Sequence, residues 1–233
     1  MVTSVIDYFT RNGKTVFGAA MDMSKAFDMV KWSKLFFRLI ERKINPLFIR
    51  LLFYIYENQQ YTVKWGEARA EFFKVSNGVR QGRVSSGIFF VVYIDNLLVL
   101  LRKSGLGCMI HGVYYGAVIY ADDIFLLSAS RTGLQEMVNI SQNFVSKLNL
   151  KFGTDSNPEK SKTKCIAFSK RRRAMTPFKQ IILDEHALPW VEQVKHLGHT
   201  LQVDNSMKID INLKRGAFIG KVNSILQEFY YAD

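Results

Sequence analysis

The sequence predicts an α+β fold. Short apolar runs typical of buried strands alternate with longer stretches that have the pattern of helices, and no internal repeat or long linker divides the chain. Its 233 residues, 48% hydrophobic and 13% aromatic, are enough to bury a core and lie at the upper edge of one domain. We therefore expect a single domain over residues 1–233.

The predicted elements follow from local patterns. Pro46 suits the first turn of a helix, where the N–H group that proline lacks needs no partner. Helices are predicted at 2–10, 33–42, 46–58, 86–102, 133–150 and 209–229. Strands or hairpins are predicted at 16–21, 61–65 with 71–75, 113–127, 164–168 and around 181–188.

Two adjacent carboxylates, Asp122 and Asp123, stand between the apolar runs 117–119 and 124–127. This pattern predicts a hairpin with buried strands and a charged tip. Neighbouring anions at the end of a buried strand pair need a positive partner. A divalent metal with oxygen ligands, Mg²⁺ above all, meets that need. The alternative is an ordinary hairpin turn, in which Asp is common.

A third carboxylate, Asp22, ends the strand-like run 16–21. Two strands can therefore bring Asp22 and Asp122 to one place, with Asp123 beside them. Two-metal phosphoryl transfer needs carboxylates that hold ions roughly 3.5–4 Å apart. We predict Asp22, Asp122 and Asp123 as catalytic metal ligands for Mg²⁺, with Mn²⁺ as an alternative ion.

The chain is strongly basic, with a formal net charge of +12 and a pI near 9.7. This favours a polyanionic partner such as nucleic acid, although a membrane-surface or ribosomal protein has a similar charge. Residues 159–173 contain seven Lys or Arg and one acid, which indicates either phosphate contacts or a solvated basic face. The expected nucleic-acid contacts are Lys160, Lys164, Lys170, Arg171, Arg172 and Arg173.

Cysteines and apolar stretches limit the cellular setting. Cys108 and Cys165 have no paired spacing, which favours a reducing, intracellular compartment, nuclear or cytoplasmic, and no zinc site. The apolar run 88–101 is fourteen residues long and is interrupted by Asp95 and Asn96, whereas a bilayer requires about 20. We therefore expect a buried core helix and no membrane association, and no signal peptide is visible at the amino terminus.

Five segments, in order, resemble the motifs of reverse transcriptases from non-LTR (LINE-type) retrotransposons. Residues 21–30 (MDMSKAFDMV) resemble motif A, residues 77–82 (NGVRQG) followed by 89–98 (FFVVYIDNLL) resemble motif B, and residues 120–123 (YADD) resemble motif C. Residues 157–164 (NPEKSKTK) resemble motif D and residues 194–198 (VKHLG) motif E. Each segment is short, but their order and spacing match over nearly the whole chain.

The resemblance implies a right-hand polymerase palm, in which an antiparallel sheet packs on helices, with incomplete fingers and the start of a thumb at 209–233. It implies an RNA-directed DNA polymerase that binds an RNA template, a DNA primer and a deoxynucleoside triphosphate (dNTP). The carboxylates would then serve the in-line attack of the primer 3′-hydroxyl on the α-phosphate.

Roles for individual residues follow from the same resemblance. Phe27 corresponds to a steric gate that rejects ribonucleotides, and the alternative is a core aromatic. Gln81 and Gly82, with Arg80, would contact the template and the incoming nucleotide, because glycine allows close backbone approach; the alternative is a loop with a helix cap. Lys162 best matches the motif D lysine, for which the resemblance implies protonation of pyrophosphate, and Lys160 is the alternative.

Departures from the family pattern keep other functions open. Arg83 stands where a small residue is usual, and Gly87 where a proline opens the helix. We also expect the remaining fingers, thumb and endonuclease segments of a parent polyprotein to lie outside this chain, so that it binds nucleic acid but extends primers poorly. The alternatives are a catalytically inactive nucleic-acid-binding remnant, and a structural or interaction protein without metal.

Overall fold

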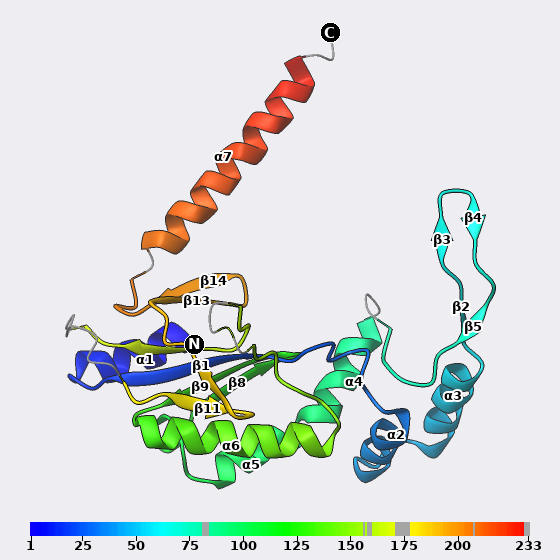
Figure 1. Cartoon of the computed structure of the whole chain (residues 1–233), viewed down its shortest axis with the longest axis horizontal. Helices are drawn as coiled ribbons and strands as arrows, with labels where there is room; N and C mark the ends of the chain where they lie inside the picture. The colour runs from blue at the N-terminus through cyan, green and yellow to red at the C-terminus, as the bar shows by residue number, and fades with distance from the viewer. Residues whose placement is uncertain (81–83, 156, 158–159, 171–177, 207, 231–233) are drawn as a thin grey trace.

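The computed structural model describes residues 1–80, 84–155, 157, 160–170, 178–206 and 208–230. Its centre is a four-stranded antiparallel sheet with the order β10-β1-β9-β8 (Figure 1). These strands are β1 (Val16–Asp22), β8 (Ala117–Tyr120), β9 (Asp123–Ser128) and β10 (Lys164–Phe168). Strand β1 is therefore central, although both of its partners come much later in the sequence.

Both faces of the sheet are covered. Along β9, Ile124 and Leu126 point into the larger core, whereas Phe125 and Leu127 belong to a second core on the opposite face. All four side chains are almost completely buried. Successive residues of a strand point to opposite faces, so burial on both faces explains why the run 124–127 is continuously apolar.

Helices supply most of the cover. They are α1 (Val2–Arg11), α2 (Trp32–Glu41), α3 (Pro46–Glu57), α4 (Val84–Ile94), α5 (Asn96–Lys103), α6 (Arg131–Lys147) and α7 (Lys208–Tyr230). Helices α5 and α6 lie below the sheet, and α1 lies against the second core (Figure 1). Side chains cap the amino-terminal ends of two helices. The Ser130 hydroxyl accepts a hydrogen bond from the Gly133 N–H at the start of α6, and the Asn45 side chain accepts one from the Leu47 N–H at the start of α3.

The helix predicted at 86–102 is two helices, interrupted at Asp95. Asp95 forms an ion pair with Arg42, which follows α2, and Asp is a weak helix former. The apolar stretch is also longer than the predicted fourteen residues, since Ser85–Lys103 is long and apolar enough to cross a membrane by length and composition. Part of it lies in the larger core, where Phe90 and Tyr93 are fully buried.

Short strands form the hairpins around this body. They are β2 (Gln60–Tyr61), β3 (Lys64–Trp65), β4 (Ala68–Arg69), β5 (Phe73–Lys74), β6 (Met109–Ile110), β7 (Val113–Tyr114), β11 (Ile181–Leu183), β12 (His186–Leu188), β13 (Gln193–His196) and β14 (His199–Gln202). The hairpin β13–β14 was not predicted. Its turn residues Leu197 and Gly198 have φ of 48° and 73°, and leucine is a poor signal for such a turn, which favours Asn or Gly.

Helix α7 projects from the body as a single rod (Figure 1). It is attached at its first turn, where the buried carboxylate of Asp210 accepts from the Thr200 N–H at 2.9 Å and pairs with Lys214 at 2.9 Å. Beyond this turn its large apolar side chains, Phe218 and Phe229 among them, are exposed. The helix predicted at 209–229 is thus confirmed as an element.

Candidate active site

Asp22 and Asp123 lie side by side on the neighbouring strands β1 and β9. Residues Asp22 and Asp123 are the last paired residues of the β1–β9 ladder, and directly paired residues have Cα atoms about 4.5–5.5 Å apart. Alternation along β1 puts Asp22 on the same side as Ala20, which packs against the second core. The two carboxylates therefore emerge on the face of the sheet that carries the β13–β14 hairpin.

The turn between β8 and β9 holds the third carboxylate. Tyr120 pairs with Asp123, so that Ala121 and Asp122 form a two-residue connection. Ala121 has φ of 51°, a left-handed conformation that costs an alanine about 1–2 kcal/mol. This turn keeps Asp122 next to the strand end instead of extending the ladder.

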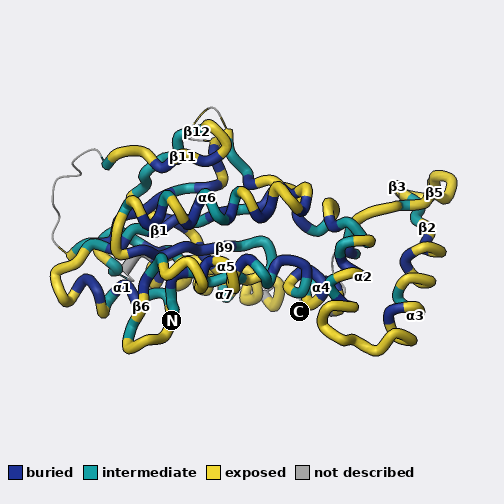
Figure 2. The backbone as a smooth tube through the Cα atoms, turned by 90° about the horizontal axis from the view of Figure 1, so that it is seen from below, coloured by how far each residue is buried: buried dark blue, intermediate teal, exposed yellow. Residues whose placement is uncertain are grey.

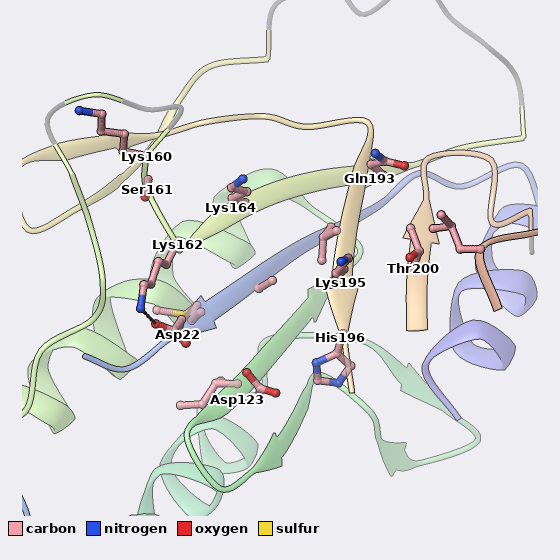
Figure 3. A pocket seen from close by; sticks show the side chains of 15 residues that line it. Asp22, Asp123, Lys160, Ser161, Lys162, Lys164, Gln193, Lys195, His196 and Thr200 are labelled. Carbon is pink, nitrogen blue, oxygen red and sulfur yellow. Dashed lines mark ion pairs between the residues drawn. The ribbon is translucent and has the colours of Figure 1, made fainter. Parts of the chain in front are cut away.

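A pocket of about 840 Å³ opens beside the two strand ends. Asp22 and Asp123 are among the residues that line it, and the Lys162 side chain points toward Asp22 (Figure 3). Gln193 and His196 of β13 also line it. Four lysines line it: Lys160, Lys162, Lys164 and Lys195. The pocket thus combines two carboxylates with a predominantly positive wall, as a site for a phosphate ester and a cation requires.

The carboxylates disturb one another. Burial is the largest influence that raises the pKa of Asp22; the Lys162 ammonium opposes it, and the charges of Asp122 and Asp123 add to it. Burial, followed by the charge of Asp122, also raises the pKa of Asp123. The Asp22 Oδ2 atom is buried and has no hydrogen-bond partner among the described residues, and Lys162 Nζ lies 3.7 Å from it.

A cation would relieve this repulsion. Carboxylate oxygens are the ligands that Mg²⁺ and Mn²⁺ prefer. The Oδ2 atom of Asp22, which makes no hydrogen bond to the described residues, is available as one metal ligand. Within the described part of the chain, however, no three His, Cys, Asp or Glu side chains are gathered into a metal-binding group. The carboxylate oxygens fit a divalent metal, whereas among the described residues the cation paired with Asp22 is the Lys162 ammonium.

Residues 2–201 match the family described as reverse transcriptase (RNA-dependent DNA polymerase). The chain belongs to the reverse transcriptase family. By this family it is an RNA-directed DNA polymerase domain. The curated relatives that it matches are retrotransposon proteins, which supports the predicted non-LTR type.

Two relatives show the extent of the similarity. The chain is 25% identical over 206 residues to the Pol polyprotein of retrotransposable element R2 from Nasonia vitripennis, covering 86% of this chain and 20% of that protein. It is 27% identical over 155 residues to the R2DM polyprotein of Drosophila melanogaster, covering 66% and 15%. The match with this chain therefore spans a fifth or less of the length of these relatives.

Solved structures share the fold. Telomerase from Candida tropicalis, truncated from its C-terminal domain, superposes with a TM-score of 0.57 at 17% identity and covers 87% of this chain and 38% of that chain. Telomerase from Candida albicans with a fragment of telomeric RNA gives 0.57 at 15% identity, covering 88% and 33%. These matches confirm the predicted α+β polymerase fold.

The remaining predicted residues do not all reach the pocket. Phe27 is partly buried, packs against the larger core and stacks on Phe90 at 4.9 Å between ring centroids. Arg80 Nε donates to Gln59 Oε1 at 3.1 Å and to the Tyr61 hydroxyl at 3.0 Å, and its guanidinium lies over the Tyr61 ring. Neither Phe27 nor Arg80 lines the pocket.

The loop that carries Arg80 is nevertheless tied to the segment after Asp22. The Val79 N–H donates to the Phe27 carbonyl at 2.9 Å, and the Gly78 N–H donates to the Val30 carbonyl at 2.8 Å. Gly78 has φ of 88°, and a Cβ there would lie 3.1 Å from the Asp28 carbonyl oxygen. Only glycine allows this close approach without strain.

Several predicted contacts lie outside the described residues: Gln81, Gly82, Arg171, Arg172 and Arg173. Lys170 is exposed beyond the end of β10 and does not line the pocket. Among the predicted basic residues, Lys160, Lys162 and Lys164 are the ones that the structure brings to it.

Two pocket residues, Lys195 and His196, were not predicted as site residues. His196 is 8% exposed, its Nε2 has no hydrogen-bond partner among the described residues, and its ring lies 4.9 Å from that of Phe125. Burial lowers the pKa of His196. The resemblance of 194–198 to motif E was the available signal, but it did not say which side chains face the carboxylates.

Proposed function

We propose that this domain catalyses the addition of a deoxynucleotide from a dNTP to the 3′-hydroxyl of a DNA primer on an RNA template, by two-metal nucleotidyl transfer. The supporting observation is the pairing of Asp22 with Asp123 at the end of the sheet, beside Asp122 and a lysine-lined pocket, in a chain of the reverse transcriptase family.

Asp22, Asp122 and Asp123 are the proposed metal ligands. Two Mg²⁺ ions held there would activate the attacking hydroxyl and stabilise the leaving oxygen. The chain's own contribution is to hold Asp22 and Asp123 together at the pocket, with Asp122 in the adjoining turn outside the pocket lining. The cost is the partial burial, and then the mutual repulsion, that raise the pKa of Asp22 and of Asp123. That cost favours binding of cations, because a bound cation removes it.

The lysines of the pocket are proposed to bind phosphate. Lys162 is proposed to donate a proton to the leaving pyrophosphate, as the motif D resemblance implies. Lys160, Lys164 and Lys195 line the same pocket and would neutralise the triphosphate and the primer strand. Phe27 is proposed as the wall against the sugar 2′-position, and Gln81 and Gly82 with Arg80 as contacts to the nucleotide and template. Residues 209–233 are proposed as the start of a thumb.

Template-primed incorporation of labelled dNTP with Mg²⁺ tests the proposal. We expect slow incorporation, which Asp22→Asn and Asp122→Asn each reduce by roughly 10²–10³-fold, the range expected when a charge-stabilising group is lost, while the affinity for primer-template is retained. Asp204→Asn is the matched control, because Asp204 lies outside the pocket. Binding without any metal-dependent incorporation would instead favour the inactive nucleic-acid-binding alternative.

A further inference from the structure

Lys162 is held against Asp22 by the backbone. The Gly153 N–H donates to the Asp22 carbonyl at 2.8 Å, and the Gly153 carbonyl accepts from the Thr163 N–H at 3.1 Å. One residue therefore joins the end of β1 to the segment that carries Lys162. The fit is close, since a Cβ at Gly153 would lie 3.3 Å from the Lys162 Cβ and 3.4 Å from Asp22 Oδ2.

The neighbours of Lys162 fix its backbone further. Ser161 and Thr163 are buried, and the Ser161 hydroxyl donates to the Thr163 carbonyl at 2.9 Å. The Lys162 side chain is 71% exposed, yet its Nζ lies 3.7 Å from Asp22 Oδ2. A long, mobile side chain is thus attached where its ammonium can reach the one buried carboxylate oxygen that has no hydrogen-bond partner among the described residues.

We propose that Lys162 is an internal counter-ion that competes with a divalent cation for Asp22. The proposal rests on the proposed function, because it takes Asp22 as a metal ligand. When Lys162 is paired with Asp22, the carboxylate is neutralised without a metal; when a cation binds, Lys162 has to leave. The same displacement would free its ammonium for a nucleotide phosphate, so that the lysine and the metal exchange places.

The size of the effect follows from electrostatics. Even at the dielectric constant of water, a unit charge about 4 Å from a divalent ion changes the affinity for that ion by roughly 30-fold in dilute salt, and screening by salt reduces this to roughly tenfold. Lys160 provides the matched control, because it lines the same pocket with the same charge and forms no ion pair with a carboxylate among the described residues.

The test is Mn²⁺ binding to the full chain, followed by electron paramagnetic resonance of the free ion, for wild type, Lys162→Met, Lys160→Met and Asp22→Asn. Thermal melting checks that each variant is folded. We expect Lys162→Met to bind Mn²⁺ roughly tenfold more tightly than wild type, Lys160→Met to change the affinity by less than about threefold, and Asp22→Asn to lose the site.

Equal or weaker binding by Lys162→Met would overturn the proposal, and so would an equal gain in Lys160→Met, because the effect would then be one of net charge. Mn²⁺ binding that Asp22→Asn leaves intact, or no binding in wild type and Lys162→Met alike, would contradict the proposed metal site itself. Binding by Lys162→Met but not by wild type would support the competition in its strongest form.

Discussion

At the scale of single residues, the site stores unfavourable energy. Asp22 and Asp123 are directly paired on neighbouring strands. Two like charges in such a pair destabilise the sheet, and Asp122 in the adjoining turn adds a third negative charge. Lys162 offsets part of the repulsion. Ala121 adds backbone strain through its φ of 51°. Such strain persists where the surrounding structure fixes it, and it is common at functional sites.

Ala121→Gly should raise the free energy of unfolding by about 0.5–1 kcal/mol, because glycine adopts a positive φ without the clash of a Cβ. Urea denaturation of the variant and the wild type measures this difference in the free energy of unfolding. Ala117→Gly in β8 is the control and should lower the free energy of unfolding by a similar amount, since Ala117 is not among the residues with positive φ. A loss of stability in both variants would show that the turn is not strained.

Phe27→Ala separates the two interpretations of Phe27. As a gate, the variant should accept ribonucleotides more readily; as a core residue, it should only lose stability, by about 2–3 kcal/mol for a partly buried ring. The stacking on Phe90 predicts some loss in either case. The deciding measurement is the ratio of ribonucleotide to deoxynucleotide incorporation, with Phe27→Leu as a variant that keeps an apolar side chain of similar bulk.

At the scale of secondary structure, local patterns carried most of the prediction. The strand 164–168 was found because residues 165–168 are a short, continuously apolar run. The helix predicted at 209–229 is present as α7, although its apolar residues are spread around the helix and do not form one stripe. The β13–β14 hairpin was missed because Leu197 occupies a turn position that usually holds Asn or Gly. The carboxylates could be predicted from strand ends, whereas Lys195 and His196 reach the pocket only through the packing of that hairpin on the sheet.

The attachment of α7 should depend on the charge of Asp210. Hydrogen bonds from Lys214 and from the Thr200 N–H hold the pKa of Asp210 at about 2, below its ordinary 3.8. A depressed pKa means that the stabilising contribution is complete above the ordinary value and is lost as pH falls from about 4 towards 2. Fluorescence anisotropy of a probe on the exposed part of α7 should report this release.

Asp210→Asn should release α7 at neutral pH and remove the acid transition. Glu228→Gln makes the same change of charge at an exposed position of the same helix and should leave both unchanged. If Asp210→Asn behaved like wild type, the Thr200 and Lys214 contacts would not be what attaches the helix.

At the scale of the whole molecule, charge and shape point to a long ligand. The chain has a net charge of +12, and two extensions leave the sheet-centred body, α7 and the β2–β5 hairpin (Figure 1). Exposed residues predominate along α3 and the hairpin (Figure 2), and Trp65 in the hairpin is 86% exposed. Duplex nucleic acid is long enough to contact the pocket and lie along such a surface.

Binding of primer-template should weaken steeply with salt, because each neutralised phosphate releases counterions. Lys195→Met should reduce the slope of log affinity against log salt by about 1 and weaken all sequences alike. Lys103→Met is the control, because Lys103 is exposed at the end of α5 and does not line the pocket. It should leave the slope unchanged. A slope near zero for the wild-type chain would favour the alternative of a protein that does not bind nucleic acid.

The central position of β1 also sets the order in which the chain can fold during synthesis. Its partners β9 and β10 are translated roughly 5–30 s after β1, at the usual 5–20 residues per second. Until then both edges of an apolar strand are unpaired, a state prone to aggregation, and among the described helices only α1 precedes it in the chain. Asp22 is therefore synthesised well before Asp123. The carboxylate pair can form only after Asp123 has been added, when more than half of these 233 residues have been translated.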